Sequence, residues 1–166
     1  MCKPASFIIV NGQPPKWSVN TENHTGIRKE HGVPENTDTL TASVQVEITP
    51  PDGDLQNPIK DWIFKVNQDR LPKWWDASEA EVAVRVELKK WAAKKLIKKD
   101  IDVISEGQFY LCGGNISAVR GGTISAVWDG QIIVYTRTDP NILKTSQAVM
   151  IDRCKKNIVV YIGADK

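Results

Sequence analysis

The chain lacks the features that mark most disulfide-rich, zinc-binding and membrane proteins. Its three cysteines, Cys2, Cys112 and Cys154, are far apart, and no Cys-x-x-Cys pair occurs. This argues against a disulfide framework and a cysteine zinc site, and it favours reduced thiols inside a cell. No apolar run approaches the roughly 20 residues that a membrane-spanning helix needs, and the apolar stretch 7–10 is too short for a signal peptide. We therefore expect a cytoplasmic protein with no membrane partner.

A surplus of one charge sign is also lacking. The net charge is +2, so the chain as a whole resembles neither a nucleic-acid-binding protein nor an acidic mimic of DNA. There is no Gly-x-Ser-x-Gly elbow, no phosphate-binding glycine loop and no His-Glu-x-x-His motif. His24 and His31 stand without a cysteine or carboxylate that would complete a metal set. We predict no catalytic residue, no metal site and no cofactor.

What is present is an ordinary globular composition and a clear succession of elements. At 166 residues the chain suffices for one domain with an attached repeat module. Strands at 6–10 and 16–19 around Asn11-Gly12 predict an opening hairpin. A short helix capped by Thr21 and ended by Gly32 is expected next. Alternation of apolar and polar residues then predicts strands at 39–48 and 62–66.

One long helix is predicted from residue 77 to about residue 97. Asp76, followed by Glu79 three residues later, has the form of a capping box. Acidic residues open the helix and lysines close it, as the helix dipole favours. An apolar stripe at intervals of three and four residues marks the expected buried face: Val84, Leu88, Trp91, Ala92 and Leu96.

An eight-residue repeat occupies the C-terminal half, with a glycine at the first position of each copy. Because eight is even, each repeat presents the same positions to the same face of a strand. Ile116, Ile124 and Ile132 share one such position and are expected to form one continuous inner face. The copies begin at Gly114, Gly122 and Gly130 and span 114–121, 122–129 and, in degenerate form, 130–137.

Two architectures fit the repeat. In a short β-solenoid, equivalent residues stack above one another. In an antiparallel β-meander, Gly121-Gly122 and Asp129-Gly130 form hairpin turns and Ile116 lies opposite Val127. The periodicity favours the solenoid. About three octads bury little on their own, so we predict a homo-oligomer, most simply a dimer through this C-terminal β module.

These elements predict the α+β class in two parts. Residues 1–105 are expected to form an α+β domain with the long helix. Residues 106–166 are expected to form the octapeptide-repeat module, which closes with a strand pair at 148–152 and 158–162.

Several segments follow one another in an order that resembles a known family. They are 47–54, 62–69, 71–75, the octads, and finally 140–144 with 148–153. In this order the chain is similar to an uncharacterised family of small proteins from phages, prophages and gut bacteria. In that family an N-terminal α+β part precedes a variable number of Asn-Ala-Thr-Val-like octads. The resemblance implies a β-solenoid, a spacer or interaction surface, and a role in conflict between phage and host; it supplies no catalytic residues.

Two groups of residues are candidates for binding. The lysine-rich end of the long helix suits phosphate or nucleic acid, although a solvated helix face explains it more simply. Its candidate residues are Lys90, Lys94, Lys98 and Lys99, with Lys89 and Lys95 beside them. Lys95 falls close to the apolar stripe and is expected to extend its ammonium group to water.

The second group is aromatic. Trp62, Trp74 and Trp75 either line a ligand surface or close a core between strand and helix. Because Trp74 and Trp75 are adjacent, one of them is expected to face outward as an interface anchor. In the octads, Arg120 and Trp128 complete the predicted binding set.

The leading functional hypothesis is a non-enzymatic interaction protein of a phage or mobile element. It would act in the cytoplasm of the bacterial host on a host protein, inhibiting a factor such as an immune effector. The alternative is a sponge for a small ligand or nucleotide, with a pocket near Trp74 and the lysine-rich helix end. Nucleic acid is a weaker candidate partner, and an enzyme in the N-terminal half is a weaker third class.

Overall fold

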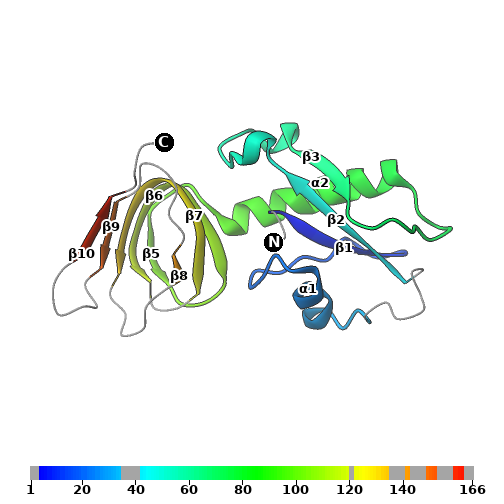
Figure 1. Cartoon of the computed structure of the whole chain (residues 1–166), viewed down its shortest axis with the longest axis horizontal. Coiled ribbons are helices and arrows are strands. Elements are labelled where there is room, and N and C mark those ends of the chain that lie inside the picture. Colours follow the sequence, from blue (N-terminus) through cyan, green and yellow to red (C-terminus); the bar gives the residue numbers. More distant parts are fainter. Residues whose placement is uncertain are drawn as a thin grey trace. The chain divides into compact units, whose positions relative to one another are not determined.

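The computed structural model describes residues 4–34, 42–119, 122–134, 141–142, 149–152 and 159–162. The chain divides into two units, Met1–Ala92 and Ala93–Lys166, and each is described by itself (Figure 1). Helices and strands are mixed, which confirms the α+β class. The boundary falls within helix α2 (Ala77–Lys95), earlier than the expected 105/106, because strands at 96–104 already pair within the second sheet.

The first unit is built on a three-stranded antiparallel sheet. Its order is β1 (Ser6–Val10), β2 (Ser43–Thr49) and β3 (Ile63–Val66). The predicted turn at Asn11-Gly12 is present, but the segment after it meets β1 only at the Ile8–Lys16 bridge. The opening hairpin is therefore present only as this bridge on one edge of β1. On its other edge β1 pairs with β2 along its full length.

The outer edge of β1 is closed by hydrogen bonds from the segment that follows it. Ile8 and Lys16 exchange two backbone bonds of 2.9 and 2.8 Å. The Ser6 N–H donates to the Glu22 carboxylate at 3.0 Å. A sheet edge satisfied in this way cannot recruit a further strand.

Helix α2 covers one face of this sheet (Figure 1). Three residues of the predicted apolar stripe, Val84, Leu88 and Trp91, are at most 1% exposed. The Trp62 and Trp91 rings meet edge to face with centroids 5.8 Å apart. Of the two alternatives for Trp62, a ligand surface or a core between strand and helix, the structure therefore shows the core. Trp62 itself lies just before β3, at the end of the short helix η2 (Ile59–Asp61).

Both helices begin at side-chain caps. Asp76 Oδ1 accepts the N–H groups of Ser78 and Glu79 at 2.8 and 2.9 Å, which confirms Asp76 as the cap of α2. Helix α1 (His24–Glu30) is capped by Asn23, whose Oδ1 accepts the Thr25 N–H. The expected cap, Thr21, is wrong by two residues. Its hydroxyl accepts the N–H of Asn23, which lies before the helix and is itself the cap.

Strand and helix ends differ modestly from expectation elsewhere. Helix α2 ends at Lys95 because the next two residues form strand β4 (Leu96–Ile97). The described part of the strand predicted at 39–48 begins at Ser43. The turn after it contains the short helix η1 (Pro51–Gly53), with Asp52 in the left-handed region at φ 53°.

The second unit is a seven-stranded sheet in which all pairs but one are parallel. Its two long strands, β6 and β7, pair along their lengths; β4 and β5 pair with β6, and β8 and β9 with β7. The exception is the antiparallel pair β9–β10, which confirms the predicted C-terminal strand pair. The remaining strands are β5 (Ile101–Ile104), β6 (Gln108–Val119), β7 (Thr123–Val134), β8 (Asn141–Ile142), β9 (Val149–Asp152) and β10 (Val159–Ile162).

The register of β6 and β7 corrects the reading of the octads. Because the two strands are parallel, the antiparallel meander is wrong for these residues. Ile116 pairs with Ile132, whereas Ile124 pairs with Phe109. Alternate octads therefore lie side by side, not consecutive ones. Asp129 and Gly130, which the meander would place in a turn, lie inside β7.

One glycine of the repeat has a steric reason to be glycine. Gly122 has a φ of +83°, and a Cβ at this position would lie 2.6 Å from the Gly107 carbonyl oxygen. The neighbouring Thr123 N–H donates to that same oxygen at 2.7 Å. The close approach of 107 and 122 thus sets where β7 begins beside β6.

Candidate binding groove beside Trp74 and Trp75

A groove of about 170 Å³ lies in the first unit where α2 begins. Trp74 and Trp75 stand on one side of it, both half-buried, with ring centroids 6.2 Å apart and planes at 62°. The turn after β1 forms the other side. The residues that line the groove are Ile9, Val10, Asn11, Gly12, Gln13, Trp74, Trp75, Asp76, Glu79, Ala80 and Ala83.

Local sequence places both walls. The Trp75 N–H donates to the Pro72 carbonyl at 3.0 Å, and this turn holds the two indoles immediately ahead of the α2 cap. On the opposite wall, Gly12 adopts a φ of +69° in a four-residue turn, 10–13, which the Gln13 N–H closes by donating to the Val10 carbonyl at 3.1 Å. One tryptophan of the adjacent pair was expected to face outward; in the structure both are half-buried.

The lining is acidic. It includes the carboxylates of Asp76 and Glu79, both on exposed residues, and it contains no lysine, arginine or histidine. Asp76 uses Oδ1 for both cap bonds, which leaves Oδ2 for a further donor. Indole faces beside carboxylates attract cations and repel phosphate, so the groove suits a basic side chain better than a nucleotide.

The lysine-rich end of α2 lies far from the groove. Lys90 is fourteen residues after Asp76, which corresponds to about 21 Å along a helix axis. Lys90 is therefore not part of the groove, whose lining contains no lysine.

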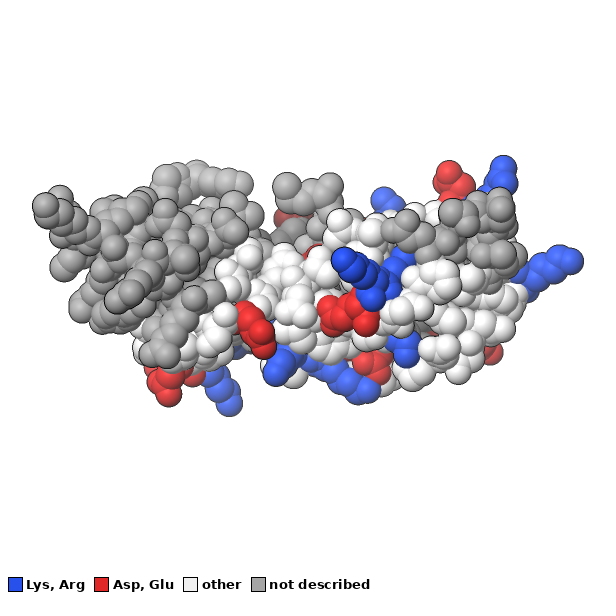
Figure 2. Space-filling view, turned by 90° about the horizontal axis from the view of Figure 1, so that it is seen from below, with Lys and Arg blue, Asp and Glu red and all other residues white. Residues whose placement is uncertain are grey.

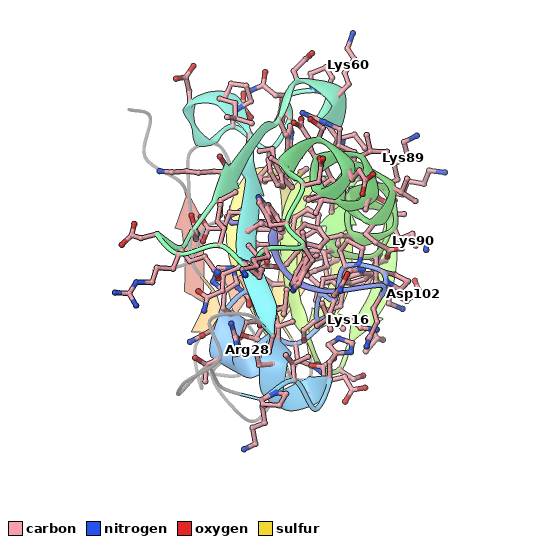
Figure 3. The ribbon with its side chains drawn as sticks, turned by 90° about the vertical axis from the view of Figure 1, so that its right-hand side faces the viewer. Lys16, Arg28, Lys60, Lys89, Lys90 and Asp102 are labelled. Carbon is pink, nitrogen blue, oxygen red and sulfur yellow. The ribbon has the colours of Figure 1, made fainter. Side chains whose placement is uncertain are left out.

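Lys90 is also engaged within its own unit. Its Nζ lies 2.6 Å from Glu87 Oε1, and Glu87 Oε2 accepts the Trp17 indole N–H at 3.2 Å. Burial acts to raise the pKa of Glu87, but the Lys90 and Trp17 donors outweigh it and lower that pKa below its usual value. Lys89 and Lys90 project outward from α2 (Figure 3).

The remaining predicted lysines belong to the second unit. Lys94, Lys98 and Lys99 are exposed. Lys95 is fully buried, with Nζ 5.9 Å from the centre of the Tyr110 ring, so the expectation that it reaches water is wrong. On the face drawn in Figure 2, basic and acidic side chains are interspersed, as on a solvated surface.

The side chains of Arg120 and Trp128 lie outside the described residues.

A buried polar cluster in the first unit was not predicted. The Glu22 carboxylate, 4% exposed, accepts the Trp91 indole N–H at 3.0 Å and the Ser6 N–H at 3.0 Å. Nothing in the local sequence around Glu22 signals burial, because its partners lie far along the chain. The cluster ties α2 to the edge of β1 and has a structural role.

The two histidines serve different carbonyl groups. His24 Nε2–H donates to the Val46 oxygen at 3.2 Å, and His31 Nε2–H to the Trp17 oxygen at 2.8 Å. Burial lowers the pKa of His24, and this outweighs the opposing effects of the Val46 bond and of Glu47. Among the side chains that the structure places, no three of the types His, Cys, Asp and Glu gather in a group that could hold a metal ion.

Comparisons with known proteins add no relative. No protein-family model matches the chain, and no curated protein or solved structure shows significant similarity to it. Over the described residues, no helix combines the length and apolarity needed to traverse a membrane.

Proposed function

We propose that the chain is a non-enzymatic interaction protein that binds a basic side chain of a partner protein in the groove beside Trp74 and Trp75. The observation that carries the proposal is the groove itself. Two half-buried indoles adjoin two carboxylates, and no basic residue is present in the lining. A lysine or arginine side chain would gain cation–π contact with an indole and charge attraction to Asp76 and Glu79.

The setting of this interaction rests on the family resemblance. A protein of a phage or mobile element in the cytoplasm of a bacterial host would meet host factors, and the proposed partner is such a factor, for example an immune effector that is inhibited on binding. A half-buried tryptophan beside a groove is typical of residues that dominate protein interfaces.

We further propose that the second unit is a short β-solenoid with two octads in each coil. A straight strand of 12 residues, such as β6, would span about 36 Å. The link from Val119 to Thr123 can span at most about 14 Å, yet β7 begins beside the start of β6. This supports strands that bend back on themselves, and Figure 1 draws β6 and β7 as parallel arcs.

In this proposal one coil contains 15 or 16 residues, so each residue lies beside the one that follows it by that number in the sequence. The pairs Gln108 with Thr123 and Ile116 with Ile132 have these spacings. The antiparallel strand β10 then lies at one end of the stack, where a cap would be expected. A solenoid of this kind would serve as a spacer or platform, and recognition would remain with the first unit.

The groove is tested with defined probes on the full chain. Tryptophan fluorescence or NMR titration with Nα-acetyl-lysine amide and Nα-acetyl-arginine amide should show saturable, salt-sensitive binding. Asp76→Asn preserves the helix cap while removing one charge, and it should weaken binding by about threefold to tenfold. Trp75→Leu should abolish it.

The alternative hypothesis, that the groove binds a nucleotide, is tested in the same assay. ATP and cyclic nucleotides should neither bind the groove nor raise the melting temperature. If a nucleotide stabilises the chain and the basic amides do not bind, the proposal is overturned. A host protein recovered from a bacterial lysate supports it only if Trp75→Leu loses that protein while Lys98→Glu retains it.

A further inference from the structure

Helix α2 carries apolar residues on the side that faces away from the sheet. Val84, Leu88 and Trp91 account for its buried side. Val82 and Val86 are nevertheless 66% and 53% exposed. Four residues apart on a helix, these two valines lie one above the other on the same face.

The exposed face continues in both directions with a regular spacing. Glu79 precedes Val82 by three residues, and Lys89 follows Val86 by three. The resulting spacing of three, four and three is typical of a seam between two packed helices. We call the face formed by Glu79, Val82, Val86 and Lys89 the outer seam.

The charges of the outer seam have no partner within the described part of the chain. The ion pairs there join Arg85 to Glu81 and Lys90 to Glu87. Glu79 and Lys89 take part in neither pair. The seam therefore presents an acid at one end, a base at the other and two valines between them.

We propose that the outer seam is a self-association surface, on which α2 of a second copy packs in the antiparallel sense about a two-fold axis. With the axis at the level of residue 84, Val82 lies opposite the partner's Val86, and Glu79 lies opposite the partner's Lys89. A parallel arrangement would instead place like charges together. Only the antiparallel pair is complementary in charge, and a two-fold interface repeats each favourable contact.

The surface is small, so the dimer is weak. Two valines and two ion pairs at the rim resemble the lower end of specific interfaces, and the expected dissociation constant is about 10–100 µM. The surface differs from the C-terminal β module that the octads suggested for self-association. It shares only Glu79 with the groove lining.

Sedimentation of the full chain between about 1 and 1000 µM tests this surface, because these concentrations extend about tenfold below and above the expected range of the dissociation constant. The wild type should shift from monomer to dimer. Val82→Ser with Val86→Ser should remain monomeric with an unchanged circular dichroism spectrum, whereas Val103→Ser, at an exposed valine of β5, should dimerise normally.

Charge exchange tests the antiparallel sense. Lys89→Glu places two acids opposite each other and should weaken the dimer at least tenfold at low salt. Adding Glu79→Lys to that variant restores opposite charges and should recover most of the affinity. Any of three results would overturn the proposal: the wild type stays monomeric, the valine changes leave the dimer unaffected, or the double charge variant binds no better than Lys89→Glu. If the valine changes have no effect, the C-terminal module becomes the alternative dimer interface.

Discussion

The Trp91 indole N–H donates to Glu22 Oε1 at 3.0 Å, across 69 residues of sequence. Glu22 Oε2 accepts the Ser6 N–H from the edge of β1. One buried carboxylate thus joins the long helix, the first strand and the segment between β1 and α1. The helix is positioned by a polar contact as well as by the apolar stripe.

Glu22→Leu should therefore lower the free energy of unfolding by about 2–4 kcal/mol, because it removes the carboxylate that accepts two buried N–H groups. Trp91→Phe removes one donor and some packing and should also destabilise. Urea denaturation followed by circular dichroism measures both. Glu106→Leu, at an exposed carboxylate, is the control and should change stability little. Equal effects of Glu22→Leu and the control would contradict a structural role for Glu22.

His24 should make folding stability depend on pH. Burial lowers its pKa in the folded state, so the fold favours the neutral ring, and the unfolded chain binds a proton more readily. The contribution is fully present above pH 6.5 and is lost as pH falls below that value. His24→Gln, which retains a donor for Val46, should show a smaller loss of stability between pH 7.5 and 5.5. Parallel stability curves for the two proteins would refute this assignment.

Gly122→Ala should destabilise the second unit by about 1–3 kcal/mol, since its new Cβ would lie 2.6 Å from the Gly107 oxygen. Gly53→Ala is the matched control, because Gly53 has a similar φ of +77° but no atom within 4 Å of such a Cβ. It should report the cost of backbone strain alone. Thermal unfolding of the two variants separates the steric part. If they lose equal stability, the close approach of 107 and 122 does not constrain the chain.

The cap of α2 can be separated from the groove chemistry. Asp76→Ala should cost about 1 kcal/mol, because the Ser78 and Glu79 N–H groups lose their acceptor. Asp76→Asn should be nearly neutral in stability while still weakening the binding of basic amides. Denaturation and titration on the same samples check both statements. A large loss of stability with asparagine would show that the charge of Asp76 matters to the fold.

Prediction from sequence succeeded where the signal and its partner lie within a few residues. The Asp76 cap is of this kind, since the side chain bonds to N–H groups two and three positions later. The C-terminal strand pair was located within about one residue at each end. The acidic groove next to Trp75 was predicted only in part. The two tryptophans were identified as binding candidates from the sequence, but the residues of the opposite wall were not.

Long-range partners required the folded chain. The Asn11-Gly12 turn predicted the antiparallel contact of Lys16 with Ile8 on one edge of β1, but it gave no sign that β2, more than thirty residues later, pairs along the other edge. Glu22 could not be recognised as buried because Ser6 and Trp91 meet it only in the tertiary structure.

The octads illustrate the same division. Their even period was sufficient to establish that equivalent positions share a face, because side chains alternate strictly along a strand. It left open which copies lie side by side. A residue could pair with its equivalent in the next octad or in the one after, and in both cases equivalent side chains would lie on the same face of the sheet. The tertiary structure decided for two: Ile116 lies beside Ile132, and Gly122 approaches Gly107 so closely that only glycine fits. Periodicity along the chain thus determined orientation, while backbone hydrogen bonds between distant segments determined register.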